Sequence, residues 1–238
     1  MTDEKTIEIF INPLQLLDVD EPWASITDHK PTLESIVEFI CTPSIGSDLE
    51  SLVSRYNEIS KEKPRLFAAP AEQRLLDKLI WPLRHAKAGY MVGNYLGTIA
   101  LCGMVAEMVA ILLYEISNFS LNNKPMTEQD QINVFGRKFE KLGQDRRVQV
   151  LHAYGVIDDQ LKKAFDLIRT TRNKYLHLWS QDHDQLPSDA IATYNAAILI
   201  AVSAIGQNIR DGKLILNPSL VKYLAQKGLY KDKDENSV

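Results

Sequence analysis

Two long stretches without a charged side chain do most to limit the folds open to this chain: Ala88–Ala106 and Ala190–Ile209. Each is long enough to cross a bilayer as a helix. Both contain polar residues, however: Asn94 and Thr98 in the first, and Asn195, Ser203, Gln207 and Asn208 in the second. Because such interruptions are costly in hydrocarbon, we expect two helices buried on most sides in a soluble core, with membrane insertion as the alternative.

The first uncharged stretch is expected to belong to one long helix, from Ala86 to Ile116. Gly89, Gly93 and Gly97 recur every fourth residue, so on one helix they lie on the same face and let another backbone approach closely. In a membrane this pattern is typical of a dimerisation face. In a soluble protein it predicts a tight internal helix crossing, which we favour.

The rest of the chain also has helical periodicity, so the predicted fold class is all-α. Helix-start signals occur at Pro31, Ser47, Ala71, Thr127, Asp158 and Asn217. The helix after Thr127 is expected to continue through Phe139 and to end at Gly143. A short helix should then end at Gly155, and Ser188 should cap the second uncharged helix, which is expected to run to about Arg210.

Composition and charge exclude several functional classes. The 238 residues carry a formal net charge of −4, with a pI near 5.8, which argues against a broad nucleic-acid-binding surface but leaves room for a small basic site. Cys41 and Cys102 both lie in apolar surroundings, so neither a disulfide framework nor a zinc knuckle is expected. The N-terminus begins with acidic residues rather than with a signal-peptide pattern. These features predict a cytoplasmic protein.

A polar residue interrupts the apolar stripe of the segment Leu161–Ser180. Leu161, Phe165, Ile168, Tyr175 and Trp179 fall at helical spacing, and Arg172 lies on the same stripe. An arginine at such a position either pairs with a buried acid or faces a site that binds an anion. Glu107, the only charged residue between Ala88 and Tyr114, is the candidate structural partner.

Arg172, Asn173 and His177 together carry the residue types needed for metal-independent RNA cleavage. The imidazole would move the proton while the ribose 2′-hydroxyl attacks its own phosphodiester, and the guanidinium would stabilise the growing negative charge. Five residues on a regular helix correspond to a rotation of about 140°, so Arg172 and His177 diverge. A bend in the helix, or a second copy of the chain across a two-fold axis, would bring them together.

The segment from Leu142 to Trp179 resembles the closing part of a HEPN domain, a family of small all-helical nucleotide-binding and ribonuclease modules. The resemblance rests on the turn Gly155-Val156-Ile157, an acidic helix start, Ile168-Arg169, and Arg172-Asn173 followed by His177. The signature of that family is an arginine, usually followed by a polar residue, with a histidine four to six positions further on. The resemblance covers roughly residues 75–210.

The resemblance implies a bundle of four or five helices that forms a homodimer, with the two motifs lining one cleft. Active members of the family are metal-independent endoribonucleases in toxin, anti-phage defence and RNA-processing systems. On that basis Arg172 would stabilise the phosphate, His177 would act as acid and base, and Asn173 would position the substrate. Arg169, Lys174 and Tyr175 would contact the RNA, and no cofactor is expected.

Other members of the family keep the fold and serve as binding or assembly modules. The alternative is therefore a catalytically silent module whose partner is a protein of a defence or regulatory complex, such as an antitoxin. The predicted domains are an N-terminal arm and helical extension at residues 1–70, a HEPN-like bundle at 71–230, and a disordered tail at 231–238.

Two further groups of residues are candidate sites. His177, Asp182, His183 and Asp184 could be a metal cluster, but their spacing does not match the common metal motifs and the acids lie in a polar loop, so no metal site is expected. Lys138, Lys141, Arg146 and Arg147 form a modest basic patch, either a solvated face or a contact for an RNA backbone.

Overall fold

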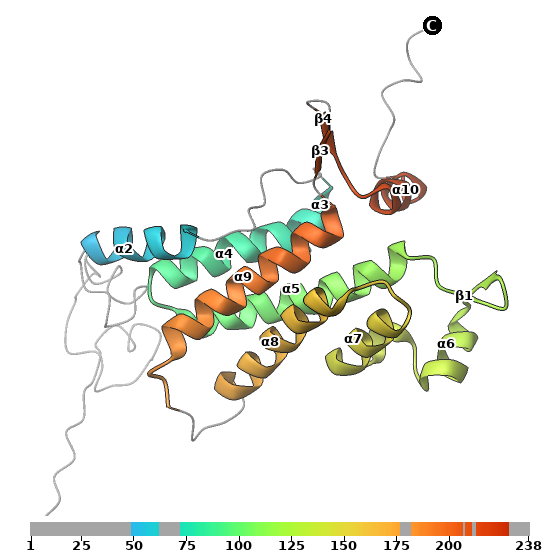
Figure 1. Ribbon diagram of the computed structural model, residues 1–238, viewed down its shortest axis with the longest axis horizontal. Coiled ribbons are helices and arrows are strands. Elements are labelled where there is room, and N and C mark those ends of the chain that lie inside the picture. Colours follow the sequence, from blue (N-terminus) through green and yellow to red (C-terminus); the bar gives the residue numbers. More distant parts are fainter. Residues whose placement is uncertain (1–48, 62–71, 177–181, 207, 211–212, 229–238) are drawn as a thin grey trace, which may run out of the picture.

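The computed structural model describes residues 49–61, 72–176, 182–206, 208–210 and 213–228 (Figure 1). The expected N-terminal arm, the helix predicted at Pro31 and the tail at 231–238 lie outside these residues and stay predictions.

The described part of the chain is all-α, as predicted, with two short antiparallel strand pairs beside the helices. The helices are α2 (Leu49–Ser60), α3 (Gln73–Leu75), the π-helix η2 (Leu76–Ile80), α4 (Trp81–Met91), α5 (Tyr95–Ile116), α6 (Glu128–Phe135), the 3-10 helix η3 (Phe139–Lys141), α7 (Gln144–Ala153), α8 (Asp159–Leu176), α9 (Leu186–Ile205) and α10 (Pro218–Gln226). The strand pairs are β1 (Ser120–Leu121) with β2 (Lys124–Pro125), and β3 (Asn208–Arg210) with β4 (Lys213–Ile215).

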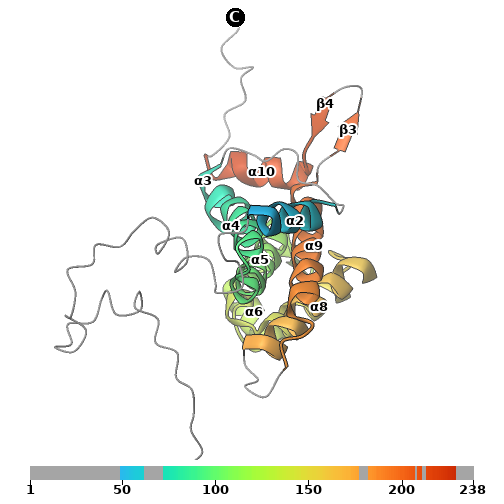
Figure 2. The same ribbon diagram turned by 90° about the vertical axis from the view of Figure 1, so that its left-hand side faces the viewer.

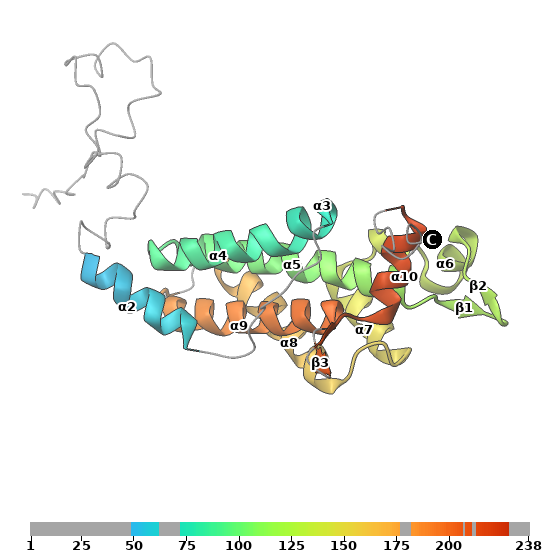
Figure 3. The same ribbon diagram turned by 90° about the horizontal axis from the view of Figure 1, so that it is seen from above.

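Helix α5 is the centre of the fold. It packs against α4, α8, α9 and α7, and Figures 1 and 3 show α4, α5 and α9 grouped side by side. Its buried residues include Ile99, Cys102, Val105 and Val109. A helix that is apolar around most of its circumference is stable in water only when neighbouring helices cover it, so the composition of α5 accounts for its central place.

The two ends of the bundle carry smaller elements. Helix α2 packs on α4, although Val53 and Tyr56 on its apolar stripe remain exposed. Helix α10 contacts α5, and Figure 2 shows it crossing above the main helices, which are seen end-on. Asn217 caps α10 by accepting a hydrogen bond from the backbone N–H of Ser219, as the sequence predicts for a helix start there.

The single helix expected from Ala86 to Ile116 is wrong, because the chain turns between α4 and α5. Gly93 has a φ of 76°, a left-handed conformation that glycine adopts without strain, and Asn94 caps α5 by accepting a hydrogen bond from Gly97. The three glycines therefore do not share one helix face. A close crossing exists between α4 and α5 instead, where a Cβ on Gly89 would lie 3.3 Å from the hydroxyl of Thr98.

Three other helix boundaries differ from the prediction. Helix α6 ends at Phe135 because Gly136 takes a left-handed conformation with a φ of 81°, and Gly143 is the N-cap of α7 rather than the end of α6. Helix α9 begins at Leu186, which places Ser188 inside its first turn. It ends at Ile205, where Gly206 is left-handed, and the chain continues into β3 instead of remaining helical to Arg210.

Several local predictions are confirmed. Thr127 starts α6 with a capping box, in which its hydroxyl accepts from the N–H of Asp130 and the Asp130 carboxylate accepts from the N–H of Thr127. Helix α7 is followed by Gly155 in a left-handed conformation. Helix α8 starts at Asp159, with the Asp158 side chain accepting from the N–H of Leu161.

Helices α5 and α9 are long and apolar enough to cross a membrane by length and composition, and half of the most apolar window of each is buried within the structure. They pack directly against each other in the described bundle. A core helix of a soluble protein meets the same criterion, so this property alone does not assign the chain to a membrane.

We expect the substitution Ile200→Ala to lower the free energy of unfolding by about 2–5 kcal/mol, because it leaves a cavity in the core. Ile200 on α9 is 0% exposed, whereas Ile132 on α6 is 39% exposed and provides a matched control. Urea denaturation should show a loss within about 1 kcal/mol for Ile132→Ala. Equal losses for both variants would contradict the assignment of α9 to the core.

Candidate functional site

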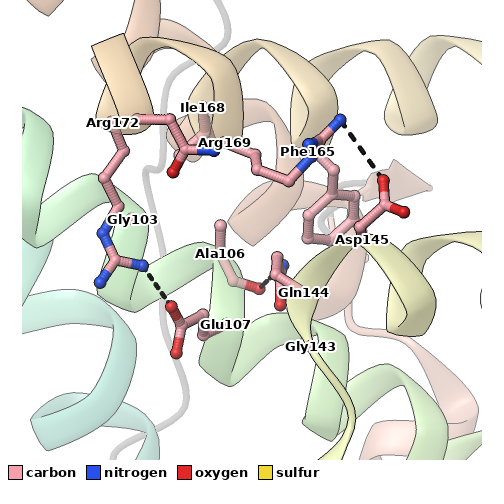
Figure 4. A pocket seen from close by; sticks show the side chains of 11 residues that line it. Gly103, Ala106, Glu107, Gly143, Gln144, Asp145, Phe165, Ile168, Arg169 and Arg172 are labelled. Atoms are coloured by element: carbon pink, nitrogen blue, oxygen red, sulfur yellow. Dashed lines mark hydrogen bonds and ion pairs between the residues drawn. The ribbon is translucent and has the colours of Figure 1, made fainter. Parts of the chain in front are cut away.

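Helix α8 joins the core to the polar residues singled out in the sequence. Its buried residues are Ala164, Phe165, Ile168, Thr171 and Tyr175. Through them it packs against α9, α5 and α7. Arg169 and Arg172, one turn apart along the same helix, lie next to this buried face and extend over the neighbouring helices α7 and α5 (Figure 4).

Arg172 forms an ion pair with Glu107 of α5, in which Nη1 of the guanidinium donates to Oε1 of the carboxylate. Glu107 is the acid that the sequence singled out as a structural partner. The side chains of Arg172 and Glu107 are 37% and 31% exposed, so the pair is neither fully solvated nor fully buried. Part of the desolvation cost of an internal charge is thereby avoided, while the attraction exceeds that of an open surface pair.

Gly103 allows Arg172 to reach Glu107. A Cβ at Gly103 would lie 2.8 Å from Cδ of Arg172, closer than real Cβ contacts, and 3.4 Å from its Nε. The side chain of Arg172 therefore crosses α5 at a glycine, where no side chain of α5 blocks its path. Gly103, which the sequence analysis did not single out, is thus a part of this site.

Arg169 lies at the other end of the same surface, and its hydrogen bonding is less complete than that of Arg172. Its Nη2 is 3.3 Å from Oδ1 of Asp145 on α7 and 3.5 Å from Oδ1 of Asp166 on α8. The side chain is 34% exposed, but its Nε atom is buried and has no hydrogen-bond partner in the described structure. A buried donor without a partner is costly, which makes Arg169 the incompletely satisfied residue of the site.

A cavity of about 350 Å³ lies between α5, α7 and α8. Its polar lining consists of Glu107, Gln144, Asp145, Arg169, Arg172 and Asn173, and its apolar lining includes Ala106, Phe165 and Ile168. The volume is within the range of small-molecule sites. The two arginines and two acids balance in charge, with one ion pair at each end of the cavity (Figure 4).

The start of α7 forms one wall of this cavity. Gly143 is the N-cap of α7 and makes no side-chain capping hydrogen bond, and Gly143, Gln144 and Asp145 all line the cavity. The side chain of Gln144 donates to the backbone oxygen of Ala106 on α5, which ties the start of α7 to the core helix. The positive end of the α7 dipole therefore faces the same space as the two arginines.

Of the predicted substrate-binding residues, only Arg169 lines the cavity. Lys174 and Tyr175 turn toward α9, where Asp189 accepts a hydrogen bond from Lys174 Nζ at 2.9 Å and from the Tyr175 hydroxyl at 2.7 Å. Burial raises the pKa of the Asp189 carboxyl, but the hydrogen bonds from Tyr175 and Lys174 outweigh it and hold that pKa below its ordinary value. These two residues join α8 to α9, a role the sequence analysis missed although Asp189 lies in the first turn of a predicted helix.

Asn173 lines the cavity and is exposed, whereas His177 lies outside the described residues. The predicted convergence of Arg172 and His177 therefore stays a prediction. Among the described residues no group of three or more histidines, cysteines or acids is arranged to hold a metal ion. The ring of His183, a candidate metal ligand in the sequence, packs against that of Tyr175 in a T-shaped arrangement, with the ring centroids 5.8 Å apart.

The modest basic patch predicted from the sequence is not a uniform solvated face. Arg147 is buried and donates to the backbone oxygens of Phe139 and Glu140, so it closes the turn before α7. Lys138 pairs with Glu128, and Arg146 is exposed and bonded to Gln149.

Comparisons with known proteins do not assign a family. No protein-family model, curated protein or solved structure matches this chain.

A double-mutant cycle with Glu107→Gln and Arg172→Gln should give a coupling energy of about 1–2 kcal/mol, since the pair is half-buried. The measurement is the free energy of unfolding of the wild type, both single variants and the double variant in urea. Glu140 and Lys141 are the control pair, because Nζ of Lys141 is 3.7 Å from Oε1 of Glu140 and both side chains are largely exposed. Their coupling should be close to zero, and an equally small coupling for Glu107 and Arg172 would show that their pair is not formed in solution.

The Asp189 interactions should make stability depend on pH in acid. A carboxyl with a lowered pKa in the folded state contributes stability above its ordinary value near 3.8, and this contribution is lost as the pH falls through the lower folded value. The difference in unfolding free energy between the wild type and Asp189→Asn should therefore be larger at neutral pH than at about pH 3. A difference that does not change with pH would count against a charged Asp189 between α8 and α9.

Proposed function

We propose that this chain is a HEPN-like helical module that binds a partner in a defence or regulatory complex and does not itself cleave RNA. The main support for this proposal is the ion pair between Arg172 and Glu107. In a ribonuclease of this type, the arginine must stabilise negative charge that develops on the phosphate. Here the charge of that arginine is already matched by a carboxylate of the same chain.

The charge balance of the cavity supports the same proposal. Its two arginines are matched by Glu107 and Asp145, and Lys174 is matched by Asp189 on the other face of α8. An extended RNA strand is held by rows of unpaired lysines and arginines along its backbone. With these cations paired and a net charge of −4, the chain is better suited to a compact ligand or a protein partner.

A second function, metal-independent endoribonuclease, is favoured by one specific observation. Arg172 and Asn173 line the same cavity, and Arg172 is still 37% exposed despite its ion pair. A guanidinium has five N–H donors, and the contact to Glu107 uses Nη1, so other donors could bind a phosphodiester. In this alternative a homodimer would bring His177 of each copy to the shared cleft, as part of a toxin or anti-phage system.

Both functions place the protein in the cytoplasm as a homodimer, with an antitoxin or another defence component as its protein partner. They differ in what happens to RNA.

Purified protein incubated with mixed RNA in the presence of a chelator should leave the RNA intact, and Arg172→Ala and His177→Ala should behave in the same way. Intact RNA is expected because Glu107 already neutralises Arg172. Gel analysis of the RNA over time is the measurement. Cleavage by the wild type that falls by about 10²-fold or more in both variants would instead establish the ribonuclease.

Arg84→Ala is the matched control for this experiment. It removes one positive charge from an exposed position on α4 that does not line the cavity. Cleavage that is equally strong in the wild type and in all three variants would indicate a contaminating nuclease and leave neither role to Arg172.

A further inference from the structure

We infer that a second cavity, between α3, η2, α5 and α10, binds a medium-chain carboxylate, with the charged end at Arg74 and Lys78 and the hydrocarbon chain along α5. This cavity has a volume of about 200 Å³. None of its lining residues lines the cavity between α5, α7 and α8. Binding at this second site is therefore independent of the proposed function.

The apolar wall of the second cavity is a side of α5 that the described helices leave partly uncovered. Met108, Ile111 and Leu112 of α5 line the cavity and are each half-buried. Leu75 of α3 and Leu79 of η2, both buried, complete this wall. An apolar ligand that covers such a surface removes it from water, which is favourable. The wall therefore favours a ligand with a hydrocarbon part.

The rim of the second cavity carries two positive charges. Arg74 and Lys78 line the cavity and are exposed, and their side chains make no hydrogen bond or ion pair with another residue that the structure describes. By contrast, Arg169, Arg172 and Lys174 are each matched by a carboxylate. A carboxylate ligand at the rim would accept charge-assisted hydrogen bonds from both cations.

The two acids that line the second cavity already accept hydrogen bonds. Glu72 is 7% exposed, and its Oε2 caps α3 by accepting from the backbone N–H of Leu75. Glu115 of α5 accepts from the hydroxyl of Tyr223 on α10, and burial together with this bond raises the pKa of that hydroxyl to about 12. The hydroxyl therefore keeps its proton at neutral pH and remains a donor to Glu115. The charges left for a ligand to pair with are consequently the positive ones.

The helical segment that carries Lys78 is not a regular α-helix. Leu76–Ile80 form the π-helix η2, after which the N–H of Trp81 donates to the backbone oxygen of Leu76, five residues back. π-Helical turns are rare and are frequent at functional sites. Lys78 and Leu79 of this turn both line the second cavity. The irregular turn thus lies at the inferred site.

The volume of the second cavity limits the length of the hydrocarbon chain. An apolar cavity of about 150 Å³ binds benzene, so a cavity of about 200 Å³ corresponds to roughly eight carbons. Octanoate has that number of carbons and is ionised at neutral pH. It is therefore the probe that fits both the rim and the apolar wall.

Isothermal titration calorimetry of the full chain with butanoate, hexanoate and octanoate at about pH 7.5, where all three are ionised, tests the apolar wall. Each CH₂ that becomes buried should raise the affinity roughly fourfold. The gain should end with chains longer than octanoate, because they extend beyond the cavity. Equal affinities for butanoate and octanoate, or no binding of octanoate, would overturn the inference.

Octylamine, which has the same chain length and the opposite charge, tests the rim. Octanoate should bind about tenfold or more tightly than octylamine, because Arg74 and Lys78 repel a cation. Tighter binding of octylamine would assign the cavity to a ligand of Glu72 and Glu115 and would overturn the inference, as would equal affinities for the two compounds.

Arg74→Gln and Lys78→Gln should each weaken octanoate binding about threefold or more, because each removes a charge-assisted bond at an exposed rim. Arg84→Gln is the matched control, since it removes the charge of an exposed arginine on α4 that does not line the second cavity. Its affinity should stay within about twofold of the wild type. Losses of the same size in all three variants would contradict a specific rim.

Ile111→Trp keeps both cations and fills the apolar part of the second cavity. It should weaken octanoate binding about tenfold or more and leave the weaker binding of butanoate within about twofold. Octanoate affinity that is unchanged in the folded variant would overturn the inference. If circular dichroism shows that Ile111→Trp does not fold, the two rim variants decide, because they change only exposed side chains.

Discussion

The close crossing of α8 over α5 at Gly103 is the constraint on which the site depends. Helix α5 is apolar around most of its circumference, and Glu107 is its only charged residue before the last turn. A carboxylate in that setting is tolerated when a cation meets it. Arg172 reaches it because Gly103 leaves room for the guanidinium arm. The ion pair, the glycine and the apolar helix therefore form one interdependent unit.

This unit separates two faces of α8 that the sequence places close together. Arg169 and Arg172 line the cavity against α5 and α7, while Lys174 and Tyr175 bind Asp189 on α9. A rotation of 100° per residue is enough to send adjacent residues to different neighbours. The cluster of basic and polar residues between Arg169 and Tyr175 is consequently not one site, and only its Arg169–Arg172 side is in contact with a cavity.

The predictable parts of the fold are those set by local chemistry. Two helix starts are marked by the capping side chains of Thr127 and Asn217, and the end of α7 is marked by Gly155 with its positive φ. The two uncharged stretches contribute buried helices. The turn at Gly93 was missed because a glycine at every fourth position is compatible both with one helix face and with a turn. Helix α6 ends at Gly136, earlier than expected. The apolar residues keep a helical spacing through Phe139 although the helix has already ended, so periodicity alone does not reveal the break.

The acids of the site show why the remainder could not be predicted from spacing. Glu107 was identifiable because an isolated charge in an apolar helix needs a partner. Asp145 and Asp189 sit in first turns of helices, where an acid is already explained by the helix dipole. Their contacts with Arg169, Lys174 and Tyr175 arise only from the packing of α7 and α9 on α8. Asp145 and Asp189 are thus favoured by the same local effect, the helix dipole, but have different tertiary roles. Asp145 lies beside the cavity and Asp189 lies between two helices, and the balance of charge around the cavity follows from that packing.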